Sequence, residues 1–528
     1  MAKEGVLTKK VRSDFSGGIN YYLGVRQIKD NESPLAQNCD FKGKGGVGNR
    51  DGYTQIGDNT SYASGGYGST EYQTSTIQQL IQFASNGSNV VLRYSTGGAW
   101  TAVTGTTFTN NLNMDTVQAA SVAAAAMTTT DGTLFSFNGT DAMVKYDGTS
   151  WASHTGGAVL KYGAYFDNRL WGVDPTYKDT LKFSTKSPDA TKPFDFTAAG
   201  TSSDKGSIIF QPGAGAEIIG IYVWRNALYV WTRTAIYSLV AASAANTFTV
   251  SLVTAAIGCL SFRSIRAVEN DVYFAALDGV YSLGEVGSFT SIRAINKSLR
   301  IQTIFSVLSG TNKAKLAAVY HNYKYHLFYS VYGLSNDSCM VYDIRYQGWQ
   351  DWQNIAANSA TVYHDSSNNI DMYFIHPTNS KCYKMYSGTT DDGTTITSAW
   401  SSKSFDEGEP DLIKLYFDHT FVFGSLNGSV TIDIIFDDSI VSESATLTQR
   451  NPQGGFGNST FGRSRFGGAV NTLTVSNVVN QPERIKAKDQ KFAVQYRLTS
   501  TGSWRMDTIA TTYIPMSHFK LPAANKLN

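Results

Sequence analysis

Residues 218–239, IIGIYVWRNALYVWTRTAIYSL, decide the fold, and residues 269–283, ENDVYFAALDGVYSL, repeat part of the same unit. In both copies, short runs of β-branched and aromatic residues are separated by turns rich in Asn, Asp and Gly, which is typical of strands joined by tight turns. Two tyrosine pairs have the same spacing of 44 residues: Tyr229 with Tyr273, and Tyr237 with Tyr281. A repeat of about 40–50 residues made of such strands predicts the blade of a β-propeller.

The unit recurs over residues 61–388. Seven strands are marked by a central residue, at uneven spacings of 36 to 58 residues: Leu92, Phe135, Trp171, Tyr229, Tyr273, Phe328 and Tyr373. The uneven spacing predicts six or seven blades with loops of different length. A small sheet cannot bury both of its faces alone, so we expect the blades to stack with their aromatic side chains between them. Two stacked β-sandwiches are the alternative all-β arrangement.

Residues 389–528 follow a different pattern. The sequence TTDDG at 389–393 interrupts the repeat, and the strands beyond it are longer. In residues 491–498 apolar and polar side chains alternate, which indicates a strand with one buried face. We therefore predict a β-sandwich-like platform domain over residues 389–528.

A segment of this domain, residues 451–468 (NPQGGFGNSTFGRSRFGG), has no strand or helix pattern. Loops of this length in a compact domain are usually functional or disordered. Its aromatic and basic residues could dock into a neighbouring subunit or contact nucleic acid, since both classes of site favour aromatics and arginine. A plain surface loop is the third interpretation. The candidate contact residues are Phe456, Phe461, Arg463, Arg465 and Phe466.

Residues 1–60 keep neither a helical nor a strand period for long. They carry tight-turn glycines, such as Gly17-Gly18, and more apolar anchors than a solvated tail needs. We predict an extended N-terminal arm that packs on the platform domain and on a neighbouring subunit, with a disordered leader as the alternative. Phe15, Ile19 and Arg50 are its candidate inter-subunit or channel contacts.

The composition does not indicate a strongly charged partner. The chain has 44 basic and 42 acidic side chains, a formal net charge of +2, whereas free-standing nucleic-acid binders are usually more basic. Its four cysteines are widely spaced, which favours buried free thiols. The start of the chain does not resemble a signal peptide, and no apolar run is long enough to span a membrane, so we expect no membrane insertion.

Motifs for catalysis are missing from the sequence. It has no HExxH or HxH pair, no GxSxG motif, no phosphate-binding loop and no calcium loop. A glycosidase would need two carboxylates about 5–10 Å apart, and nothing in the sequence pairs candidates such as Asp343 and Asp351. We therefore predict that the chain is not an enzyme and has no catalytic residues, no metal site and no cofactor.

Short motifs in the first 390 residues resemble a known group of proteins. They resemble the tail hub, or nozzle, proteins of short-tailed bacteriophages, a group that includes the packaged-DNA stabilisation proteins. Nothing in residues 389–528 adds to the likeness. The motifs are FSGGIN at 15–20, DNES at 30–33, NCDF at 38–41, RDGY at 50–53, YFDNRLW at 165–171, WRN at 224–226 and WQDW at 349–352.

The resemblance implies a structural virion protein, made in the host cytoplasm and built into the phage tail. Such a protein forms a homo-oligomeric, usually hexameric, ring below the portal and adaptor proteins. It would extend the DNA channel, help to retain packaged DNA and dock the tail tip or fibres, with double-stranded DNA passing through without sequence-specific binding. A receptor-binding or polysaccharide-degrading propeller of a phage tail is the alternative function, and a cellular propeller scaffold is a third.

Overall fold

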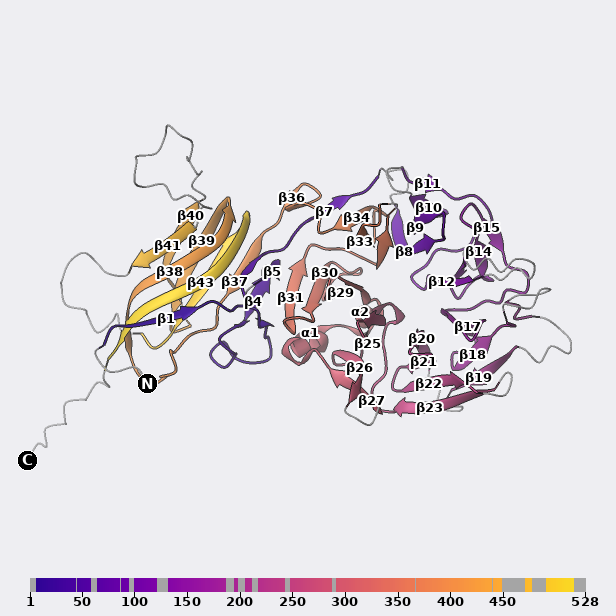
Figure 1. Ribbon diagram of the computed structural model, residues 1–528, viewed down its shortest axis with the longest axis horizontal. Helices are drawn as coiled ribbons and strands as arrows, with labels where there is room; N and C mark the ends of the chain where they lie inside the picture. Colours follow the sequence, from indigo (N-terminus) through magenta and orange to yellow (C-terminus); the bar gives the residue numbers. More distant parts are fainter. Residues whose placement is uncertain are drawn as a thin grey trace, which may run out of the picture. The chain divides into compact units, whose positions relative to one another are not determined.

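The computed structural model describes residues 6–516 except 44, 58–63, 86, 95–98, 121–131, 187–193, 198–204, 211–216, 243–246, 287–290, 366, 439, 449–470 and 477–490. The protein is all-β, as predicted (Figure 1). Helical structure in the described ranges is limited to α1 (Gln302–Val307), α2 (Gly310–Ala314) and the 3-10 turns η2 (Phe262–Ser264) and η3 (Leu299–Ile301). The chain divides into two compact units. Unit 1 comprises Met1–Gly52, Tyr342–Gln353 and Gly388–Asn528, and unit 2 comprises Tyr53–Val341 and Asn354–Ser387.

Unit 2 is a succession of small antiparallel sheets, each of which takes its strands in chain order. Figure 1 shows them one after another around a common centre. Five of these sheets have four strands each. The first two are β8 (Gly65–Gln73), β9 (Gln78–Ser85), β10 (Asn89–Tyr94), β11 (Thr101–Ala102), and β12 (Asp115–Ala120), β13 (Gly132–Phe137), β14 (Val144–Tyr146), β15 (Trp151–Ser153). The next three are β16 (Gly163–Phe166), β17 (Arg169–Val173), β18 (Thr180–Phe183), β19 (Gly206–Ile209), then β20 (Ile218–Trp224), β21 (Ala227–Thr232), β22 (Ile236–Ala241), β23 (Phe248–Thr254), and β24 (Arg266–Val268), β25 (Asp271–Ala275), β26 (Val280–Val286), β27 (Ser291–Asn296).

Two further sets of strands complete unit 2. The sixth contains β28 (Ala317–His321), β29 (Lys324–Tyr329) and β30 (Ser338–Asp343), and the seventh contains β32 (Ser359–His364), β33 (Ile370–Ile375) and β34 (Cys382–Met385). The seventh set receives its next strand from far back in the chain, because β7 (Tyr53–Gln55) pairs with β34, Met385 opposite Tyr53. The beginning and the end of unit 2 are thereby joined in one sheet.

The seven marker residues of the sequence repeat lie in seven different sets of strands. Six lie in the second strand of their set, and Leu92 lies in the third, β10. Each copy of the 44-residue repeat forms a separate four-stranded sheet. Tyr229 and Tyr273 occupy the second strands of these two sheets, β21 and β25, and Tyr237 and Tyr281 occupy the third strands, β22 and β26.

Many aromatic side chains of unit 2 are buried between neighbouring sheets. One apolar cluster joins Trp231 of β21 to Phe274 of β25, whose ring centroids are 5.8 Å apart. Another joins Leu80 of β9 to Tyr373 of β33. Pairs of buried aromatic rings stabilise a fold by about 0.5–1.5 kcal/mol beyond the area that they bury. The sheets therefore depend on one another for their cores, as the sequence pattern predicts.

Unit 1 is built on two larger sheets. The first has the order β41 (Asn471–Ser476), β38 (Lys414–Asn427), β43 (Ser503–Pro515), β6 (Val47–Asn49), β5 (Cys39–Phe41), with β1 (Thr8–Arg12) also on β43. The second runs β31 (Gly348–Gln353), β4 (Leu35–Gln37), β37 (Ser398–Ser401), β42 (Val494–Ser500), β39 (Ser429–Phe436), β40 (Ile440–Thr448). One core takes side chains from both sheets, among them Phe421, Ile432, Tyr496 and Trp504. The short strands β2 (Gly18–Ile19), β3 (Glu32–Ser33), β35 (Thr390–Asp391) and β36 (Thr394–Thr395) complete the described elements.

The described residues between 6 and 52 belong to unit 1 and contribute the strands β1 to β6 to it. Residues 342–353, which the sequence analysis placed inside the propeller segment 61–388, also group with unit 1. The physical reason is a pair of hydrogen bonds: the Asn38 amide donates to the Asp351 carbonyl at 2.7 Å, and the side chain of Trp352 donates from Nε1 to the Cys39 carbonyl at 2.7 Å.

Candidate functional site

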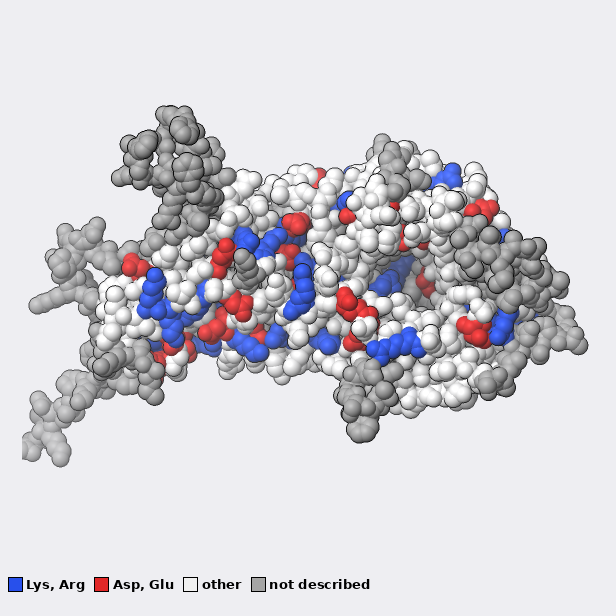
Figure 2. All heavy atoms as spheres, viewed as in Figure 1, with Lys and Arg blue, Asp and Glu red and all other residues white. Residues whose placement is uncertain are grey.

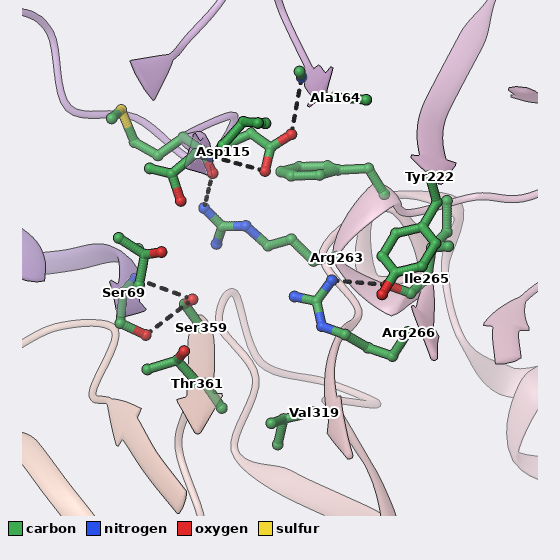
Figure 3. Close-up of a pocket in the computed structure, with 18 of the residues that line it drawn as sticks. Ser69, Asp115, Ala164, Tyr222, Arg263, Ile265, Arg266, Val319, Ser359 and Thr361 are labelled. Atoms are coloured by element: carbon green, nitrogen blue, oxygen red, sulfur yellow. Dashed lines mark hydrogen bonds between the residues drawn. The ribbon is translucent and has the colours of Figure 1, made fainter. Parts of the chain in front are cut away.

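A cavity of about 660 Å³ lies at the centre of unit 2 (Figure 3). Its wall takes residues from the first strand of each of the seven sets: β8, β12, β16, β20, β24, β28 and β32. Polar groups line much of it, including the hydroxyl groups of Ser69, Tyr222, Ser359 and Thr361. A cavity with convergent polar groups is the first place to look for a binding site in a protein of unknown function.

The 3-10 turn η2 is a hub at this cavity. Its Arg263 is 6% exposed and crosses to three other sets of strands. The guanidinium donates to the Asn358 carbonyl at 2.7 Å, to the Tyr67 carbonyl at 2.5 Å and to the Met114 carbonyl at 3.4 Å. These carbonyls lie next to β32, in β8 and next to β12. One side chain therefore ties the fifth set of strands to the seventh, the first and the second.

The neighbours of Arg263 reach the remaining sets. Phe262 packs against the ring of Tyr162, next to β16, with centroids 4.5 Å apart. A side chain at Gly220 of β20 would approach Phe262 Cβ to 3.1 Å, so this close contact depends on glycine. Tyr325 of β29 donates to the Ser264 carbonyl at 2.8 Å. A single turn thus holds all seven sets of strands together.

Charged groups of both signs line the cavity. The Asp115 carboxylate accepts hydrogen bonds from the Gly163 amide at 3.0 Å and the Thr116 amide at 2.9 Å, while burial raises its pKa. Burial also lowers the pKa of Arg263 to about 10, an effect that Asp115 opposes and the charge of Arg266 increases. Figure 2 shows basic and acidic atoms of unit 2 within a hollow of its surface. The cavity is therefore polar and charged.

The N-terminal segment of unit 1 is fixed by Arg50, which is fully buried. Its guanidinium forms a bidentate ion pair with Asp391, at 2.8 Å from Nη1 and 2.6 Å from Nη2. Nε donates to Asn38 Oδ1 at 3.0 Å. Nη1 also donates to the Asp51 carbonyl and Nη2 to the Gln353 carbonyl, both at 3.1 Å. All donors of a buried charge are thus used, which is the condition under which such a pair is stable.

Backbone geometry explains several residues of the N-terminal motifs. Gly18 has φ +76°, and an added Cβ would lie 2.6 Å from backbone atoms of Trp349. At Gly52 an added Cβ would lie 2.0 Å from the Thr390 carbonyl oxygen. Asn38 has φ 52°, a conformation that Asn tolerates better than most residues. These residues of the N-terminal motifs are therefore needed where two backbone segments of unit 1 approach closely or where φ is positive.

The candidate contact residues of the sequence analysis fall into two groups. Phe15 and Ile19 are 2% and 0% exposed in the core of unit 1, and Arg50 makes the ion pair described above. Each of the three has a role within one chain, and an inter-subunit or channel contact through them stays a prediction. The segment 451–468 lies outside the described residues, and with it Phe456, Phe461, Arg463, Arg465 and Phe466.

Sequence reasoning missed Arg263, Arg266 and Asp115. No local pattern marks Arg263, because its acceptors are backbone carbonyls 95 to 196 residues away. The turn sequence SFRS at 261–264 interrupts the aromatic repeat and was the one available signal.

Within the described residues there is neither a cluster of metal ligands nor a helix able to span a membrane. No group of three or more His, Cys, Asp or Glu side chains there has the geometry of a metal site. None of the helices in that part of the chain has the length and apolar character needed to cross a bilayer. The four cysteines are buried and free, as the sequence analysis expected.

Comparisons with known proteins give no family. No family model matches the chain, and no curated protein matches it. Among solved structures, the chain is similar to BBS1N in its complex with ARL6DN, at 10% identity and a TM-score of 0.39, over 65% of this chain and 99% of that one. It is also similar to the extracellular domain of BT4673 from B. thetaiotaomicron, at 11% identity and a TM-score of 0.36, over 76% of this chain and 48% of that one. At such low TM-scores neither likeness carries an argument about this chain.

Proposed function

We propose that the seven sets of strands in unit 2 are the blades of a seven-bladed β-propeller. Three observations support this arrangement. The sets follow one another in chain order, β7 joins the start of unit 2 to the last set, and the first strand of every set lines one cavity. Closing a ring with a strand from the other end of the domain leaves only short sheet edges exposed, which protects such a fold from edge-to-edge association. In unit 1, the two sheets with a shared core fit the β-sandwich-like platform.

We further propose that the chain is a structural subunit of the tail hub, or nozzle, of a short-tailed bacteriophage. The observation that carries the proposal is the place of the motifs that resemble those proteins. FSGGIN contributes Phe15 and Ile19 to the core of unit 1, NCDF contributes Asn38, and RDGY contributes Arg50 and Gly52. These short motifs thus coincide with residues that the fold requires, which strengthens a resemblance based on little sequence.

The construction of unit 1 suits a load-bearing part. Strands β4, β5 and β6 lie in its two sheets together with strands from the far end of the chain, β37, β42 and β43. Pulling either end of such a unit must break long-range strand pairing and the buried Arg50–Asp391 pair. A wall around pressurised DNA needs this resistance. A conduit must also hold DNA weakly, because every neutralised phosphate adds to affinity, and a net charge of +2 on 528 residues is compatible with that.

In this proposal identical subunits form a ring, expected to be hexameric, through head-to-tail contacts between two different surfaces of each subunit. The subunit meets portal or adaptor proteins on one side and tail-tip or fibre proteins on the other. The test is mass photometry and negative-stain imaging of the purified chain, alone and with its virion partners. Closed rings support the proposal, whereas a protein that is monomeric alone and also within tails contradicts it.

A further inference from the structure

The charges that line the cavity of unit 2 do not balance. Among the lining residues two are basic, Arg263 and Arg266, and one is acidic, Asp115. The Asp115 carboxylate is also occupied by two backbone amides. Two cationic groups minus one anionic group leave an excess of one positive charge among the residues that line the cavity. Like charges that are partly shielded from water repel each other more strongly than they would in bulk water.

The two arginines differ in how their donors are used. Arg263 donates to three carbonyls and is almost completely buried. Arg266 is half-buried; its Nε donates to the Ala318 carbonyl at 2.8 Å and its Nη1 to its own neighbour, the Ile265 carbonyl, at 2.8 Å. Among the described residues Nη2 of Arg266 has no acceptor. A guanidinium fixed on two nitrogens keeps the third in a defined position.

Hydroxyl groups share the wall with Arg266. Ser69 and Ser359 are linked to one another, with their Oγ atoms 3.3 Å apart, and Thr361 and Tyr222 line the same space. Guanidinium and hydroxyl donors around a small space are the groups that proteins use to bind oxyanions. An oxyanion would also neutralise the excess charge of the cavity.

We propose that the cavity of unit 2 binds a small oxyanion, a phosphate or carboxylate group, with Arg266 Nη2 as its principal donor and Tyr222 and the serine and threonine hydroxyls as secondary donors. The cavity of about 660 Å³ has room for more than the anionic group itself. The ligand class therefore includes small molecules that carry such a group as well as the free ion. This inference does not rest on the proposed role in a phage tail, and either can fail without the other.

The test titrates the full chain with inorganic phosphate in chloride buffer at constant ionic strength, with calorimetry and thermal melting as readouts. We expect saturable binding that Arg266→Met weakens at least tenfold. The control is Arg233→Met, because Arg233 is a half-exposed arginine of the same unit outside the cavity, and it forms an ion pair with Glu217. This variant should bind like the unchanged chain. Citrate should compete with phosphate if carboxylates share the site.

Absence of saturable binding, or equal binding by Arg266→Met and the unchanged chain, would overturn the proposal. A second measurement covers the case in which Arg266→Met does not fold. Crystals of the unchanged chain soaked in selenate should show anomalous density within hydrogen-bond distance of Arg266. Selenate bound only at other places, or at none, would also overturn it.

Discussion

Replacing Arg50 by Met should unfold unit 1 far more easily, and the size of the effect follows from the contacts. The change removes a fully buried guanidinium and leaves the Asp391 carboxylate, 7% exposed, without its counter-ion. It also leaves Asn38 Oδ1 and the Gln353 carbonyl with one hydrogen bond fewer. Removing one partner of a buried ion pair costs about 3–5 kcal/mol. We therefore expect a loss of that size in the free energy of unfolding of unit 1.

Hydrogen exchange followed by mass spectrometry is the suitable assay, because peptides report on each unit separately. A factor of ten in an equilibrium constant corresponds to about 1.4 kcal/mol, so 3–5 kcal/mol predicts exchange about a hundred- to several-thousand-fold faster. The acceleration should appear in peptides of unit 1, including β4, β5 and β37. The double variant Arg50→Met with Asp391→Leu should recover much of the loss, since no buried charge then remains unpaired.

The matched control is Arg26→Met. Arg26 and Asp438 also form an ion pair in unit 1, at 2.5 Å, but their side chains are 39% and 30% exposed. Solvent-exposed pairs contribute about 0–1 kcal/mol, so exchange should change less than about tenfold. If Arg50→Met altered exchange no more than this control does, the inference that Arg50 anchors the N-terminal segment would be refuted.

Three further predictions concern single residues. Gly52→Ala should destabilise unit 1 by roughly 1–3 kcal/mol in urea unfolding, because its Cβ would overlap the Thr390 carbonyl oxygen; a neutral result would contradict the close approach. Arg263→Met leaves three carbonyls without their donor, at about 1 kcal/mol or more each, and should speed exchange next to β8, β12 and β32 together; a change confined to η2 would argue against a hub. Burial lowers the pKa of His419 from its usual 6.5 to about 4, so the unfolded chain binds the extra proton and stability falls as pH drops from about 6.5 to 4, by up to about 3 kcal/mol. In urea unfolding, His419→Gln should lose that part of the pH dependence of the unfolding free energy. If the unfolding free energy of the variant fell with pH as steeply as that of the unchanged chain, His419 would not be the group responsible.

The sequence was sufficient to predict the strands of unit 2 because their signal is local. Tyr229 and Tyr273 mark equivalent strands, and the turn before each of them contains a residue with positive φ, Asn226 in the first and Glu269 in the second. Successive side chains of a strand point to opposite faces of the sheet, so a strand with one buried face shows alternating apolar and polar residues in the sequence itself. The same reasoning predicted a half-buried strand over residues 491–498, and the structure shows β42 from Val494 with Tyr496 and Leu498 buried and Arg497 exposed. The alternation does not extend further, because Gln495 is buried and Phe492 is exposed.

The contacts that hold the sets of strands together could not be predicted from local sequence patterns. Arg263 binds carbonyl groups, which every residue has, so no residue type identifies its partners. The pairing of β7 with β34 joins segments more than 300 residues apart, and three-residue strands carry little pattern of their own. The grouping of residues 342–353 with unit 1 likewise depends on hydrogen bonds with the backbone of Asn38 and Cys39. Long-range backbone contacts leave no trace in local periodicity.

We propose that this chain is a ring-forming structural subunit of a phage tail. Electron cryo-microscopy of tails assembled with the chain tests it most directly. We expect a closed ring of copies around an open channel, with unit 2 of each copy forming a ring of seven blades. A single copy bound at the periphery of the tail, away from the channel, would contradict it.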